Sequence, residues 1–287
     1  MGLLTSASWA AANVYIQRAG RALGPFRAMV WTQVVGFVVA APLSLLLERP
    51  SGAFDRSTVT WLVAGGLAAV FAYATMFYAM ERGRLSVVVP IISSWSVLAA
   101  ALSIVLLGEV PRRSQIIGAA AVVIGVMVVS RFSVVRPGDG ASATAGDART
   151  QRLALWAAVG AAVGWGVLIP SMDRLTPVAG RIGAVPLIFA IDLLLGVPLA
   201  LAVGINLRPP PRGTWPAVIA AALFETAGFV WITLGTARAP VSVVSPLASL
   251  ASAFTVLIAW LILRERPPRV VLLGAALACA GVLTLAL

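Results

Sequence analysis

The stretch LLGEVPRR at residues 106–113 recurs, with Leu, Glu, Pro and Arg in matching places, as ILRERPPR at residues 262–269. Each copy closes a long apolar run, and residues 85–108 hold no charged side chain. The two copies lie 156 positions apart, and 15 of 46 positions are identical between residues 86–131 and 242–287. Several of the identical positions are Pro, Gly, Glu or Arg, so shared apolar composition does not explain them. The chain therefore contains an internal duplication.

The composition is that of a membrane protein. Of the 287 residues, 60% are hydrophobic and 11% are charged, whereas soluble proteins carry about 25% charged residues. A bilayer core about 30 Å thick needs roughly 20 helical residues to cross it, and uncharged runs near that length recur along the chain. We predict an all-α protein with ten transmembrane helices, near residues 2–16, 28–47, 60–80, 86–107, 114–130, 153–170, 183–203, 215–235, 241–263 and 270–287.

The duplication divides these spans into five plus five. We expect one five-helix repeat at residues 1–131, a connecting loop at 132–151 and a second repeat at 152–287. Because five is odd, the second copy begins on the opposite side of the membrane, so the two repeats are inverted. Secondary transporters with this architecture place the substrate site near the midplane between the repeats. The pattern favours a transporter, with a membrane channel or a non-transporting scaffold as the alternative.

Charge and missing residue types exclude other classes. All 21 basic residues are Arg, the net charge is +11, and the arginines are spread through the short breaks between spans, which argues against a nucleic-acid partner. The sequence has no His, the commonest general base and metal ligand. It also has no G-x-x-x-x-G-K-[ST] phosphate loop. We therefore expect neither enzymatic activity nor a cofactor or metal site.

Two carboxylates lie deep inside expected spans. Asp192 and Glu225 each stand about ten residues into a span of about twenty, and the duplication pairs them with Gly36 and Ala69. Intramembrane acids usually face a cavity or a partner and mark ion or proton paths. We predict that one or both bind a cationic group of the cargo or exchange a coupling proton. The alternative is a protonated acid that hydrogen-bonds a neighbouring helix.

Other polar and aromatic side chains are candidates for the wall of a cavity. The amide of Asn13 would be costly if it faced lipid, and Arg27 would suit an anionic group. Serines at helical spacing in two spans can bind cargo or only permit close packing. The candidate residues besides the two acids are Asn13, Trp9, Trp165, Tyr73, Tyr78, Ser93, Ser249 and Arg27. Glu109 and Glu265 stand at helix ends, and we interpret them as interface anchors.

The sequence resembles the EamA branch of the drug/metabolite transporter superfamily. The resemblance rests on Trp9 and Trp165 near the start of each half, on Arg27, and on a Glu that precedes a Gly-bearing helix in both halves (Glu109 with Gly118, Glu265 with Gly274). Arg27 has no counterpart, since Gly183 stands at its offset position. The resemblance implies a bacterial inner-membrane carrier of small metabolites or drugs, often an exporter, working by alternating access.

The partners that we expect are a small-molecule cargo, protons and the lipid bilayer, with the chain acting as a monomer or weak homodimer. The two acids favour an amine-bearing or amino-acid-like cargo. The sidedness has two conflicting indications. Alternate loops carry 14 and 7 arginines, and the positive-inside rule then places both termini outside, whereas the resemblance implies cytoplasmic termini.

Overall fold

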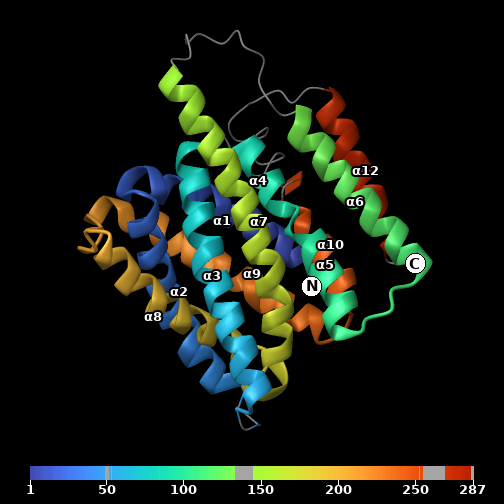
Figure 1. The fold of residues 1–287 in the computed structure, drawn as a ribbon, viewed down its shortest axis with the longest axis horizontal. Coiled ribbons are helices and arrows are strands. Elements are labelled where there is room, and N and C mark those ends of the chain that lie inside the picture. Colours follow the sequence, from blue (N-terminus) through green and yellow to red (C-terminus); the bar gives the residue numbers. More distant parts are fainter. Residues whose placement is uncertain are drawn as a thin grey trace.

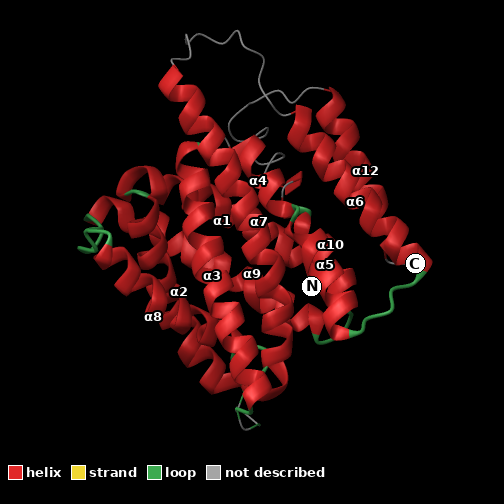
Figure 2. Cartoon of the chain, viewed as in Figure 1, coloured by secondary structure: helices red, strands yellow, loops and turns green. Residues whose placement is uncertain are grey.

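The computed structural model describes residues 1–48, 52, 54–83, 85–132, 145–251, 253–254 and 269–285. Regular secondary structure in these ranges is helical throughout (Figure 2). The helices are α1 (Gly2–Leu23), α2 (Pro25–Leu47), α3 (Arg56–Arg82), α4 (Leu85–Ser93), α5 (Trp95–Leu107), α6 (Arg113–Phe132), α7 (Ala145–Ala179), α8 (Ala184–Ala202), the 3₁₀ turn η1 (Arg212–Thr214), α9 (Trp215–Thr236), α10 (Val241–Ser249) and α12 (Arg269–Leu285).

Five helical stretches in the described part are long and apolar enough to cross a membrane. They are Pro25–Leu47, Arg56–Arg82, Arg149–Ala179, Ala184–Ala202 and Arg212–Thr236, and shorter apolar helices cover Ile91–Leu107 and Arg113–Gly125. Large apolar side chains such as Leu46, Val105 and Leu194 stay exposed on the outside of the bundle, as lipid contact requires. The expectation of a multi-pass, all-α membrane protein is confirmed.

Local sequence explains where the first helices end and begin. Helix α1 continues past residue 16, where we expected its end, and stops at Gly24, whose φ of 81° is a left-handed value that favours glycine. Pro25 then opens α2 at the first helical position, where its missing N–H costs nothing. Asp55 caps α3, because its Oδ1 accepts the Thr58 N–H at 2.7 Å. The Thr58 hydroxyl and N–H lower the pKa of Asp55.

The span expected over residues 86–107 is not one helix. It is divided at Ser94 into α4 and α5. The Ser94 N–H donates to the Ile91 carbonyl at 3.1 Å, a tight three-residue step. In the second half α10 ends before Leu250, four residues after Pro246, and the Leu250 N–H donates three residues back in the same way. The rest of the span expected at 241–263 lies largely outside the described residues.

The helices pack in matching pairs from the two halves of the chain. Helix α7 packs along α3, and α1 packs along α9, at the centre of the bundle (Figure 1). Helices α6 and α12 pack against each other at one edge. Their small residues permit this contact: a Cβ at Gly274 would lie 2.8 Å from the Gly125 oxygen, and one at Gly281 would lie 2.6 Å from the Gly118 oxygen. The order of these two contacts makes α6 and α12 antiparallel.

Candidate functional site

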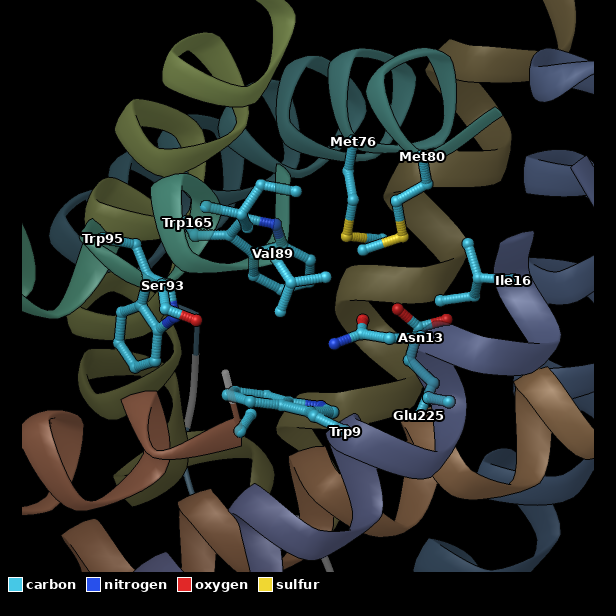
Figure 3. Close-up of a pocket in the computed structure, with 13 residues that line it drawn as sticks. Trp9, Asn13, Ile16, Met76, Met80, Val89, Ser93, Trp95, Trp165 and Glu225 are labelled. Atoms are coloured by element: carbon cyan, nitrogen blue, oxygen red, sulfur yellow. The ribbon is translucent and has the colours of Figure 1, made fainter. Parts of the chain in front are cut away.

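A cavity lies at the centre of the bundle, between helices of both halves (Figure 3). Its empty volume is about 440 Å³, including space open to solvent. Its lining reaches Met80, near the end of α3, and Val89 in α4. The lining residues are Trp9, Ala12, Asn13, Ile16, Met76, Met80, Val89, Ile92, Ser93, Trp95, Trp165, Glu225 and Ala251. Five of the ten candidate residues from the sequence are among them: Trp9, Asn13, Ser93, Trp165 and Glu225.

Both helix interruptions border this cavity. Ser93 and Trp95 flank the break at Ser94, and Ala251 follows the break at Leu250. In transporters with inverted repeats, interrupted helices near the midplane typically form the substrate site. Each half therefore places a non-helical backbone step beside the same cavity.

Aromatic rings form one wall of the cavity. The Trp9 ring packs edge-on against Trp95 with centroids 5.8 Å apart, and against Phe229 at 5.5 Å, while Trp165 lies 6.0 Å away. Neither indole N–H of Trp9 and Trp165 meets an acceptor among the described residues. A wall of this kind offers flat apolar faces, cation-π surfaces and two free donors to a bound molecule.

Glu225 supplies a carboxylate to the opposite part of the cavity. It comes from the middle of α9 and is 3% exposed. Figure 3 shows the Glu225 carboxyl group and the Asn13 amide pointing into the cavity, below the thioethers of Met76 and Met80. A negative group bordered by soft apolar side chains and by indole faces suits a cation that carries an apolar body.

Asp192 and Tyr73 lie behind this wall rather than in it. Asp192, from the middle of α8, is 1% exposed, and both of its carboxylate oxygens lack a hydrogen-bond partner among the described residues. The Tyr73 hydroxyl is within interaction range of Gln33 and Glu225 but makes no hydrogen bond of standard geometry. Asp192 and Glu225 also interact electrostatically. The two acids and Tyr73 therefore belong to one buried polar cluster.

Three candidates lie outside the cavity. Tyr78 accepts a hydrogen bond from Arg82 at 2.8 Å and carries its guanidinium over the ring. Arg27 donates to two carbonyls of the loop before α9, those of Arg208 at 2.9 Å and Pro209 at 2.8 Å, so it joins α2 to that loop. The Ser249 hydroxyl donates to the carbonyl of Pro246 in its own helix.

The opposite end of the bundle is closed by bonds between the two halves. The Glu109 carboxylate accepts the N–H groups of Val241 at 2.8 Å and Ser242 at 3.0 Å, which caps the first turn of α10. The Ser6 hydroxyl donates to the carbonyls of Leu247 at 2.5 Å and Ala248 at 3.1 Å. Glu109 thus acts as a helix-end residue, as expected, while Glu265 lies outside the described residues.

Gln33 is the residue that the sequence analysis missed. It is 1% exposed in the middle of α2, and neither end of its amide has a partner among the described residues. Two hydroxyls in the same region, those of Thr32 and Thr226, also lack partners there. The signal was present in the sequence: MVWTQVVGF (residues 29–37) sets a single amide within an apolar run, which is the criterion that identified Asn13.

Comparison with known proteins identifies the family and the fold of the chain. The model of the EamA-like transporter family matches residues 1–131 and 152–287. An uncharacterized protein of Methanocaldococcus jannaschii is 26% identical over 106 residues, which are 37% of this chain and 77% of that protein. One crystal structure of a protein superposes with a TM-score of 0.73 at 18% identity and covers 98% of this chain and 94% of its own, a likeness that shows the fold. The chain belongs to the EamA-like transporter family, within the drug/metabolite transporter superfamily.

Proposed function

We propose that this chain is a secondary transporter that exports small amine-bearing metabolites or drugs across the bacterial inner membrane by alternating access. The observation that carries the proposal is the central cavity, which both halves of the chain line and into which the buried carboxylate of Glu225 points. Members of the EamA-like family are transporters rather than enzymes. The export direction and the inner membrane come from the resemblance to drug/metabolite carriers.

Alternating access requires two halves that move against each other, and we propose two inverted five-helix repeats at residues 1–131 and 152–287. The contact between α6 and α12 supports this. Gly274 and Gly281 stand 156 positions after Gly118 and Gly125, and the contacts are Gly125 with Gly274 and Gly118 with Gly281. Exchanging the halves therefore turns each contact into the other, which is the property of a two-fold axis.

The same exchange relates the central pairs, since it converts the α1–α9 contact into the α7–α3 contact. A two-fold axis between antiparallel partners lies in the membrane plane, the arrangement of inverted-repeat transporters. The bonds of Glu109 and Ser6 join the two halves at one end of the bundle, while the cavity lining reaches Met80 near the last turn of α3. This difference between the two ends supports a state that faces one side of the membrane.

The cargo that fits best is a cation with an aromatic or aliphatic body. Glu225 offers a charge partner, Asn13 an amide, and Trp9 and Trp165 flat faces with free N–H donors. A carboxylate contact of this kind, a charge-assisted hydrogen bond, is worth about 1.5–3 kcal/mol, which corresponds to about ten-fold to a hundred-fold in affinity.

The test starts from a thermal-shift screen of amino acids, amines and cationic drugs against the purified protein. A compound that raises the unfolding temperature is then used in counterflow assays with proteoliposomes. We expect saturable counterflow, and a loss of affinity of about ten-fold or more in Glu225→Gln. Glu81→Gln is the matched control, because Glu81 pairs with Arg82 outside the cavity. Conductance without counterflow would instead identify a channel, and full affinity in Glu225→Gln would remove this acid from the site.

A further inference from the structure

The packing of α2 against α8 sets Gln33 and Asp192 at the same level of the two helices. A Cβ at Gly36 would lie 2.9 Å from the Phe189 ring, and one at Gly196 would lie 3.4 Å from the methyl carbon of Met29. Helices α2 and α8 therefore run antiparallel with Gly36 beside Phe189 and Met29 beside Gly196. Gln33 lies three residues before Gly36 on α2, and Asp192 lies three residues after Phe189 on α8. Because the helices are antiparallel, this register brings Gln33 to the level of Asp192.

Gln33 and Asp192 are both buried polar side chains without a hydrogen-bond partner among the described residues. Both are 1% exposed, and all four of their polar side-chain atoms lack a hydrogen-bond partner among the described residues. A buried polar group without a partner costs about 1–3 kcal/mol, so a structural role alone gives no reason to keep an acid and an amide together there. Neither side chain lines the central cavity.

An acid and an amide complement each other in one protonation state. A protonated carboxyl group donates its O–H to an amide oxygen and accepts an amide N–H at its other oxygen, so the pair makes two hydrogen bonds. An ionised carboxylate can only accept, which leaves the amide oxygen facing a negative charge. The Gln33 and Asp192 pair is therefore complete only when Asp192 holds a proton.

The titratable groups around Asp192 lead back to the cavity. From α9, Glu225 interacts electrostatically with Asp192. From α3, the Tyr73 hydroxyl lies beside Gln33 and Glu225 and interacts with Asp192 only electrostatically. On α2, Arg27 is bound to loop carbonyls. On α7, Asp173 interacts with Thr236, Glu109 and Arg174 near the end of the helix. Glu225 and Tyr73 thus connect the Asp192 pair to the cavity.

A proton fits this pair better than an alkali-metal ion. Sodium sites inside transporters typically use carbonyls from interrupted helices, whereas α2, α3, α8 and α9 continue through this level as α-helix. Apart from the Leu194 carbonyl, which Pro198 leaves without its helical donor, the carbonyls at this level are engaged in the helical ladder and are not free to coordinate a metal ion. A proton needs only the acid and one acceptor.

We propose that Asp192 and Gln33 form a proton-binding site behind the cavity wall, with Asp192 as the acid and Gln33 as its positioning residue. The link to transport rests on the proposed function. A cation bound at Glu225 removes the repulsion between the two carboxylates, so Asp192 can release its proton, and a proton bound at Asp192 in turn weakens the cation site. Cargo and proton then occupy the two acids alternately.

The test is infrared difference spectroscopy of the protein in lipid vesicles, with the proton itself as the ligand. Glu225 also gives a carboxyl band when protonated, so Glu225→Gln is the background for the measurement. On acidification, we expect the carbonyl stretch of a protonated carboxyl group to appear in Glu225→Gln, and the Asp192 component to be lost when Asp192→Asn is added to it. In Gln33→Met the band moves to higher frequency, because the carbonyl loses its amide donor. A band of unchanged intensity in the double variant of Glu225→Gln and Asp192→Asn, or an unmoved band in Gln33→Met, would overturn the proposal.

The matched control is Ser44→Ala on the same helix, since the Ser44 hydroxyl bonds to its own helix at Ala41; it leaves the band unchanged. Size-exclusion profiles establish that each variant is folded, and Gln33→Met keeps the test decisive if Asp192→Asn does not fold. Because the measurement needs no cargo, it separates the two proposals. If the band is present but the protein shows no counterflow, the proton site stands and the transport proposal fails. If counterflow occurs without the band, the transport proposal stands and the proton site fails.

Discussion

Glu109 and Asp192 are carboxylates of one chain in opposite situations. Glu109 stands at a helix end and accepts two backbone N–H groups from the first turn of α10. Asp192 lies in the middle of α8 and accepts no hydrogen bond from the described residues. A satisfied carboxylate at a helix N-terminus stabilises the fold, whereas an unsatisfied buried one costs free energy. Glu109 therefore stabilises the fold, whereas ionised Asp192 destabilises it, a cost that the proposed proton-binding site would explain.

The largest effect that would test this contrast is a gain of stability. At a pH where the Asp192 carboxyl group is ionised and unpartnered, Asp192→Val replaces it by an apolar group of similar size, so we expect the free energy of unfolding in detergent to rise by about 1–3 kcal/mol. Thermal unfolding of the purified protein measures it. A loss of stability would show that the Asp192 carboxyl group supports the fold, and the contrast with Glu109 would disappear.

The opposite sign is expected at Glu109. Glu109→Ala removes the acceptor of the Val241 and Ser242 N–H groups, so the free energy of unfolding falls by about 0.5–2 kcal/mol, the usual cost of a lost helix cap. Glu109→Gln keeps one acceptor oxygen and loses less. The control is Glu81→Ala, whose carboxylate pairs with a neighbouring exposed Arg. If Glu109→Ala is as stable as this control, the cap contributes nothing to the closed end.

The smallest expected effect is at Asp55, a carboxylate that caps the exposed N-terminus of α3 as Glu109 caps α10. Hydrogen bonds from Thr58 lower the pKa of Asp55 below its ordinary value of 3.8, so the cap contributes stability above that value and loses it as pH falls through the folded pKa. Asp55→Asn retains a capping oxygen and leaves stability at neutral pH nearly unchanged. When the unfolding temperature is measured against pH, we expect it to fall less steeply in this variant than in the wild type below about pH 4. If the unfolding temperature falls with acid as steeply as in the wild type, other carboxylates cause the loss of stability.

Hydropathy was sufficient to identify a helical membrane protein, because a chain in lipid must satisfy its backbone groups within helices. Span boundaries were less certain. Helix α1 runs to Leu23, and α7 begins at Ala145, inside the connecting loop expected at 132–151. The break at Ser94 was missed because Pro90 reads equally well as a kink, and only the backbone geometry shows where the hydrogen-bond ladder changes.

The candidate site was predictable in part. Glu225 and Asn13 line the cavity because a polar group in an apolar helix must turn away from lipid. Tyr78 and Arg27 were expected beside them but bind partners elsewhere. Distance along a helix does not tell which neighbour a side chain meets, and that depends on how helices far apart in sequence pack together.

The sequence by itself determined the membrane environment, the duplication and the deep placement of two acids, because hydropathy, a fixed offset and depth along a span are one-dimensional properties. The tertiary structure alone decided that Glu225 faces the cavity while Asp192 lies behind it at the level of Gln33. That distinction depends on the register of α2 against α8 and on helix rotation, which close packing of small residues such as Gly36 fixes.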